Sequence, residues 1–230
     1  MGDLFRASKV KLSRARQFIE EVDAGLQAYD SSNPTTVELD WKGSMKIHRK
    51  EVPPVVLATL GDAIHNMRAA LDLMAAELAR VNGKSDKKVY FPFAESKEEL
   101  SAQINSKHFD RAGDDAVSLL KTFEPHKGGN EKLRAIHDLD IRDKHINILV
   151  TRLDTNNLEF SFRRGEDINK PIPTSGSYSH KFLDGALAGL PLIETLKELV
   201  QLVDGIIEEF ARMVEQREAN NAVSGKRPTI

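Results

Sequence analysis

Cysteine is absent from the 230-residue chain, and several other features are scarce. Without cysteine the protein can form no disulfide, no thiolate metal site and no cysteine nucleophile. Aromatic residues make up only 6% of the chain, and neither sign of charge dominates, because 33 Lys and Arg face 35 Asp and Glu. A net charge of -2 gives no global attraction to nucleic acid or to an anionic membrane, so any nucleic-acid surface must be local.

Long apolar runs are also missing. No uncharged apolar stretch approaches the ~20 residues that span a bilayer. Asp3, Arg6, Lys9 and Lys11 stand where a signal peptide needs its apolar core. These absences predict a cytoplasmic protein with no membrane partner. The remaining composition, 40% hydrophobic and 30% charged, is typical of a folded chain with a sizeable core.

Three long amphipathic helices are predicted, because apolar residues recur every three to five positions in three segments. The first covers about 3–29. The second follows Pro53 and Pro54 and ends at Asn82 and Gly83, a pair typical of helix C-caps. The other predicted helices are the third long one at 189–216 and short ones beginning at 96, at 114–123 and at 130–144.

Short strands are predicted to pair in local antiparallel hairpins. Alternating apolar and polar residues predict one hairpin at 36–47. Another is predicted from 146–153 and 158–162, joined by a turn at 154–157. A third strand is expected near 178–182.

The order of these elements predicts the fold class and the domain organisation. The chain lacks the strand-helix-strand alternation of a parallel sheet and the long Pro/Gly/Ser linker that separates two domains. We therefore predict one α+β domain at 1–218, a helix-dominated bundle of three long helices with short antiparallel β-hairpins. Residues 219–230 are predicted to form a flexible C-terminal tail.

Polar residues at the boundary of the core mark the second long helix. At 100° per residue, His65, Arg68 and Asp72 lie within an arc of about 60° and can therefore contact one neighbour. The helix at 130–144 is more unusual, because Asp140 and later charged residues share its inward face with apolar side chains. An unpaired buried charge is costly, so we expect the two helices to pair these groups.

Two interhelical ion pairs are expected to determine how the helices dock. Arg68 is expected to contact Asp140 or Asp143. Asp72 is expected to contact Lys144 or His145. The candidate site therefore has seven residues, which are His65, Arg68, Asp72, Asp140, Asp143, Lys144 and His145.

This cluster has interpretations that the residues leave open. It can be a structural network without catalysis, which is the interpretation we favour, with no cofactor and no bound metal. In a catalytic site, an imidazole beside cations would act as a neutral base and an Arg would stabilise a pentacovalent phosphate, as metal-independent RNA cleavage requires. A further alternative is a metal site, since His65, His137, Asp138 and Asp140 are the residue types of an HD-type phosphohydrolase.

Three segments carry a resemblance to known sequences. They are GDAIHNMRAALD at 61–72, FPF at 91–93 and DIRDKH at 140–145. Together they resemble a family of uncharacterised bacterial proteins with a G-D-x-x-H-N-x-R-x-A-L-D helix, an F-P segment and a later D-K-H element. The resemblance covers most of residues 1–165 and implies no established activity.

The chain also has a looser likeness to HEPN-type helical bundles, many of which are ribonucleases of toxin and antiviral systems. Those enzymes use an Arg followed four to six residues later by a His. Here Arg134 precedes His137 by three residues and Arg142 precedes His145 by three, so the spacing differs. The likeness implies RNA as a partner, and only under this alternative. The long amphipathic helices near both ends are compatible with a homodimer.

Overall fold

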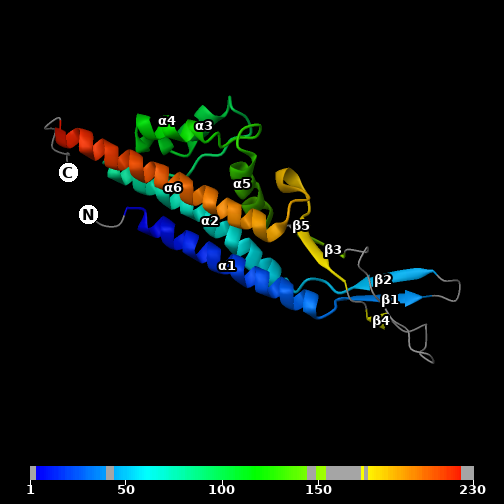
Figure 1. Cartoon of the computed structure of the whole chain (residues 1–230). Helices are drawn as coiled ribbons and strands as arrows, with labels where there is room; N and C mark the ends of the chain where they lie inside the picture. Colours follow the sequence, from blue (N-terminus) through cyan, green and yellow to red (C-terminus); the bar gives the residue numbers. More distant parts are fainter. Residues whose placement is uncertain (1–3, 40–43, 144–148, 154–171, 174–175, 224–230) are drawn as a thin grey trace.

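A computed structural model describes residues 4–39, 44–143, 149–153, 172–173 and 176–223. Helices dominate these ranges and the strands are short, which confirms the predicted α+β class. Three long helices run side by side, and the middle one in the chain packs against both others (Figure 1). They are α1 (Arg6–Ser31), α2 (Pro54–Val81) and α6 (Leu192–Val223).

The helix α2 is the centre of the structure, since it packs against α1, α5, α6 and the short helix η1. It begins at Pro54, whose missing N–H would have no partner at a helix start, and its end is followed by Gly83 at a φ of 70°. Gly25 lets α1 approach it closely, because a Cβ there would lie 2.7 Å from Val56 Cγ2. The predicted limits of α2 are confirmed, because it starts at the second of the two prolines and ends before Asn82 and Gly83.

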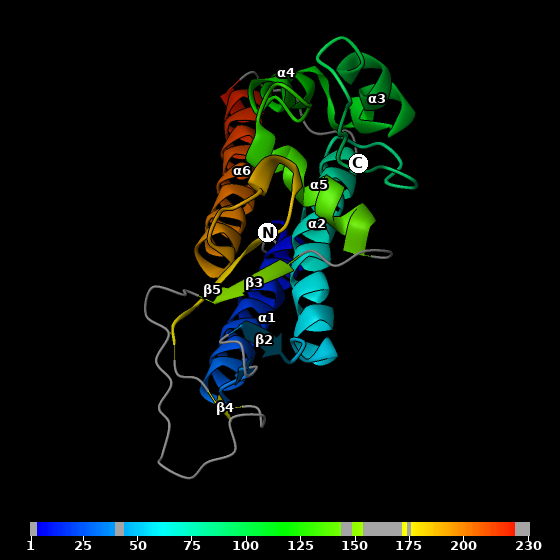
Figure 2. The ribbon, with the colours of Figure 1, turned by 90° about the vertical axis from the view of Figure 1, so that its right-hand side faces the viewer.

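Shorter helices cover one side of the long ones (Figures 1 and 2). They are α3 (Leu100–Ser106), η1 (Phe109–Ala112), α4 (Asp114–Thr122) and α5 (Glu131–Asp143). The helix predicted from position 96 begins later than expected. Ser96 Oγ accepts the N–H of Glu99 at 3.4 Å, but this contact closes a turn and α3 starts at Leu100.

The strands form two small antiparallel sheets. β1 (Thr35–Leu39) pairs with β2 (Met45–Arg49), which confirms the first predicted hairpin, and this hairpin projects beyond the long helices (Figure 1). β4 (Ile172–Pro173) pairs with the other edge of β1.

The second sheet contains a pairing that was not predicted. β3 (Leu149–Leu153) pairs with β5 (Tyr178–Phe182), a strand distant in sequence, with Leu149 opposite Phe182. The predicted partner at 158–162 and its turn lie outside the described residues. Local hairpin signals could not predict this pairing, because a non-local partner has no local signal.

The last helix is longer than predicted, so residues 219–223 are helical and are not part of a tail. The helix η3 (Gly185–Leu187) precedes it. Arg217, on its late turns, donates to both carboxylate oxygens of Asp115, at 2.9 and 2.5 Å, and to the carbonyl of Ala112. These contacts hold the end of α6 against the start of α4. Of the helices that the structure describes, none has the length and apolar character needed to cross a membrane.

Candidate functional site

The helices α2 and α5 pack against each other, as predicted, but the contact between their polar groups is different from the expected one. His65 Nδ1 lies 2.9 Å from Asp140 Oδ1 and bridges the helices. The prediction that Arg68 pairs with Asp140 is wrong, because Arg68 Nη1 donates to Asp72 Oδ1, one turn along its own helix, at 2.7 Å. The side chain of Asp143, and Lys144 and His145 altogether, lie outside the described residues.

Arg68 and Asp72 together hold the backbone N–H and C=O of Phe91, the first residue of the segment 91–95. Arg68 Nη2 donates to the carbonyl of Phe91 at 3.2 Å, and the N–H of Phe91 donates to Asp72 Oδ1 at 2.8 Å. The guanidinium carbon also lies 4.6 Å from the centre of the Phe93 ring. Both polar groups of a buried residue are thereby satisfied by side chains, as buried backbone requires.

Burial dominates the electrostatics of this pair. Burial lowers the pKa of Arg68, and the nearby charge of Asp72 opposes that effect. Burial also raises the pKa of Asp72, against the charge of Arg68 and the hydrogen bond from Phe91. Each charge is therefore kept in place by the other and by backbone groups, with little contribution from water.

A second arginine, which sequence reasoning missed, holds the other end of the same segment. Arg134 Nη1 on α5 donates to the carbonyl of Ala94 at 2.7 Å, and Nη2 donates to Glu95 at 2.6 Å. Its Nε donates to Asp138, one turn along α5, at 3.0 Å. A signal was present in the chain, because Arg134 and Asp138 repeat the four-residue spacing of Arg68 and Asp72.

His137 lies between the two arginine sites. Its ring stacks on the ring of Phe93, with centroids 4.9 Å apart and an interplanar angle of 5°. Its Nδ1 is buried and has no hydrogen-bond partner among the described residues. Burial, then the charges of Arg68 and Arg134, lowers the pKa of His137 to about 4. The imidazole is therefore neutral at pH 7.

The proposed metal ligands do not converge. His137 stacks on Phe93, Asp138 accepts hydrogen bonds from Arg134, and Asp140 contacts His65. Within the described ranges, no group of three or more His, Asp and Glu side chains could hold a metal ion. The HD-type alternative therefore gains no support from the geometry.

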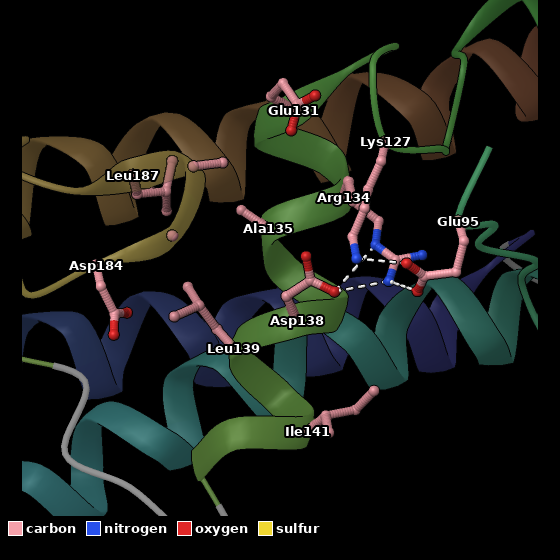
Figure 3. A pocket seen from close by; sticks show the side chains of 12 residues that line it. Glu95, Lys127, Glu131, Arg134, Ala135, Asp138, Leu139, Ile141, Asp184 and Leu187 are labelled. Carbon is pink, nitrogen blue, oxygen red and sulfur yellow. Dashed lines mark hydrogen bonds and ion pairs between the residues drawn. The ribbon is translucent and has the colours of Figure 1, made fainter. Parts of the chain in front are cut away.

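A pocket of about 530 Å³ lies on another face of α5, and no residue of the predicted cluster lines it. Its walls come from α5, the segment near Glu95 and Lys127, and the turn that contains Asp184 and Leu187 (Figure 3). Arg134 borders it, but its N–H groups are directed to Glu95 and Asp138 (Figure 3). The pocket therefore offers carboxylates and apolar side chains, while its arginine is already paired.

Comparison with models of known protein families, with curated proteins and with solved structures found no match.

Proposed function

We propose that Arg68 and Asp72 of the predicted polar cluster form, together with Arg134, a structural network that holds the segment 91–95 between α2 and α5, without catalysis by Arg68 or Asp72. The observation that supports it is that Arg68 and Asp72 take both polar groups of the Phe91 peptide. A catalytic arginine needs free N–H groups that point to a substrate, whereas these point into the protein.

The network has a second support on α5. Arg134 donates to the carbonyl of Ala94, so the two helices each hold one end of a stretch of four residues. The N–H of Ala94 also donates to the carbonyl of Pro125. Side chains of the segment, among them Phe91 and Phe93, are buried in the main core, so the structural network positions core residues.

A double-mutant cycle on Arg68 and Asp72 tests this proposal. We expect Arg68→Ala to destabilise strongly, because it leaves the buried Asp72 carboxylate without its counter-ion. Adding Asp72→Asn removes that charge and keeps an acceptor for the Phe91 N–H. Urea unfolding should therefore show a coupling free energy of about 1–3 kcal/mol between the two sites.

The matched control cycle uses Arg68→Ala with Asp204→Asn. Since Asp204 pairs with Arg16 and its charge does not act on Arg68, we expect these losses to add within about 0.5 kcal/mol. Additive losses in the Arg68 and Asp72 cycle would contradict the structural network.

A second candidate function is metal-independent RNA cleavage at His65, which one observation favours. The His65 side chain is 59% exposed, while Asp140 is only 16% exposed and holds Nδ1 at 2.9 Å. No described group hydrogen-bonds Nε2, so this nitrogen is available to a substrate. A carboxylate that orients an exposed imidazole in this way is the arrangement of a general base, here for the 2′-hydroxyl of RNA.

The test is cleavage of single-stranded RNA, structured RNA and tRNA in EDTA, which removes the metal that contaminating nucleases need. If His65 is the base, activity has an optimum between about pH 5 and 8, where imidazoles titrate, and His65→Ala abolishes it. His48→Ala is the matched control, because it removes the other solvent-accessible histidine that pairs with a carboxylate, Glu38. Activity that survives both His65→Ala and His145→Ala would exclude this candidate.

A further inference from the structure

A basic surface surrounds the loop that leads from the end of α2 to Phe91. Its cations come from the last turn of α2, from the loop itself and from the neighbouring region of η1. We define the basic surface by six residues, which are Arg80, Lys84, Lys87, Lys88, Lys107 and Arg111. The excess of positive charge at this surface contrasts with the chain as a whole, whose net charge is -2.

Hydrogen bonds bring these residues together from two distant segments. Arg111 Nη1 donates to the carbonyl of Ser85 at 3.3 Å and to that of Lys87 at 3.0 Å. The N–H of Tyr90 donates to the carbonyl of Lys107 at 3.0 Å. The loop is therefore held against the η1 region at both ends, and its lysines have a defined position.

Most of this charge is not neutralised within the protein. No described carboxylate lies in ion-pair contact with the lysines of the basic surface, whereas Arg80 has only long contacts with Glu77, at 3.7 Å, and with Asp86, at 3.9 Å. Lys84, Lys87 and Lys88 are all exposed. The exposed carboxylates of Asp86 and Asp110 offset part of this charge, but the cations outnumber them and the lysines keep free donors, which suits an anionic partner.

An exposed aromatic ring lies among the lysines. Tyr90 is 47% exposed, although its neighbours Val89 and Phe91 are 3% and 0% exposed. Because those two side chains point into the core and the Phe91 peptide is clamped by Arg68 and Asp72, Tyr90 is held outward. An aromatic ring of this kind can stack on an unpaired base, a contact that a duplex does not offer.

We propose that the basic surface binds single-stranded nucleic acid, with the lysines on the phosphates and Tyr90 stacked on a base. This deepens the ribonuclease candidate, because Arg80 and His65 lie fifteen positions apart on α2, about 22 Å along the helix and within about 60° of each other around it. Binding itself does not rest on catalysis. RNA held at the basic surface runs toward His65 along α2.

The test is fluorescence anisotropy with labelled oligo(dT) and oligo(U) of about 20 nucleotides and a DNA duplex of the same length. Oligo(dT) lacks the 2′-hydroxyl, so its binding is measured independently of cleavage. We expect both single strands to bind more tightly than the duplex, with affinity that falls as salt rises.

Variants separate the contribution of the lysines, which bind phosphates, from that of Tyr90, which stacks on a base. We expect Lys84→Gln/Lys87→Gln/Lys88→Gln to weaken binding at least tenfold at low salt and to reduce the slope of log K against log salt by about 2, since each phosphate contact on a single strand contributes about 0.7. Tyr90→Leu is expected to weaken binding about tenfold with an unchanged slope, because it removes stacking alone. All four residues are exposed, and unchanged thermal unfolding checks the fold.

The matched control removes three exposed lysines elsewhere. These are Lys46 on β2, Lys50 after it and Lys197 on α6, and their replacement by Gln is expected to change affinity less than twofold. Equal losses in the two triple variants, binding that does not depend on salt, or a preference for duplex that Tyr90→Leu leaves unchanged would each overturn the proposal. Binding of oligo(dT) without any RNA cleavage would sustain it and remove the ribonuclease candidate alone.

Discussion

Two arginines hold opposite ends of one segment, yet their electrostatic surroundings differ. Arg68 has a single carboxylate, Asp72, whose side chain is 25% exposed. Arg134 has two, Glu95 and Asp138, which are 56% and 37% exposed. Both arginine side chains are nearly covered, at 10% and 4% exposed, but Arg68 has more protein around its charged group than Arg134 has.

The pKa shifts follow both the depth of each arginine and the number of carboxylates beside it. At Arg68, burial prevails and lowers the pKa. At Arg134, burial also lowers the pKa, but hydrogen bonds and charge from Asp138 and then Glu95 outweigh it, so that the pKa is raised. At Arg134 the hydrogen bonds and charges of two solvated partners outweigh the desolvation of the arginine, whereas a pair that is buried together is costly when one partner is lost.

The largest effect is expected from Arg68→Ala. It leaves Asp72 as a partly buried charge and the carbonyl of Phe91 without its donor, so we expect a loss of about 3 kcal/mol in the free energy of unfolding, measured in urea. Arg68→Lys restores the charge but not both hydrogen bonds and is expected to recover part of the loss. A loss of stability smaller than that of Arg134→Ala would contradict the expectation that Arg68 contributes more to stability than Arg134.

Arg134→Ala is expected to cost less, about 2 kcal/mol in the same assay. The carboxylates that it leaves behind are accessible to water, Lys127 still pairs with Glu95, and the carbonyl of Ala94 keeps a contact from the N–H of Lys127 at 3.3 Å. A loss as large as that of Arg68→Ala would show that carboxylate exposure does not explain the difference.

His137, between the two arginines, predicts a pH dependence. Its pKa is about 4 in the folded protein and near 6.5 when unfolded, so the unfolded chain binds more protons between these values. Stability attributable to His137 is therefore full above pH 6.5 and is lost as the pH falls toward 4, by roughly 2–3 kcal/mol. Subtracting the unfolding profile of His137→Gln isolates this contribution, and parallel profiles would contradict it.

The smallest effect on stability is expected at the exposed interhelical pair. His65→Ala removes a contact whose histidine is 59% exposed, so we expect a change below about 1 kcal/mol at pH 7. Thermal unfolding of His65→Ala and of Arg68→Ala compares the pair of His65 and Asp140 with the pair of Arg68 and Asp72. A loss comparable to that of Arg68→Ala would place His65 in the structural network.

Much of the fold could be predicted from local patterns, and the candidate site only in part. The limits of α2 and the β1 and β2 hairpin follow from side-chain periodicity, prolines and turn residues. The contact between α2 and α5 follows from their polar faces, and it brings His65 to Asp140. The partner of Arg68 was predicted across the helices, although a carboxylate one turn away is always within reach.

The sequence by itself determined where α2 begins and ends and which faces of the long helices are apolar, because these depend on neighbours within a few positions. Only the tertiary structure decided what the polar residues do. Phe91 arrives between α2 and α5 through a long loop, and its peptide takes Arg68 and Asp72 away from α5. The pairing of β3 with β5 was decided in the same way. Contacts between distant segments depend on how the whole chain packs, and no local pattern encodes that choice.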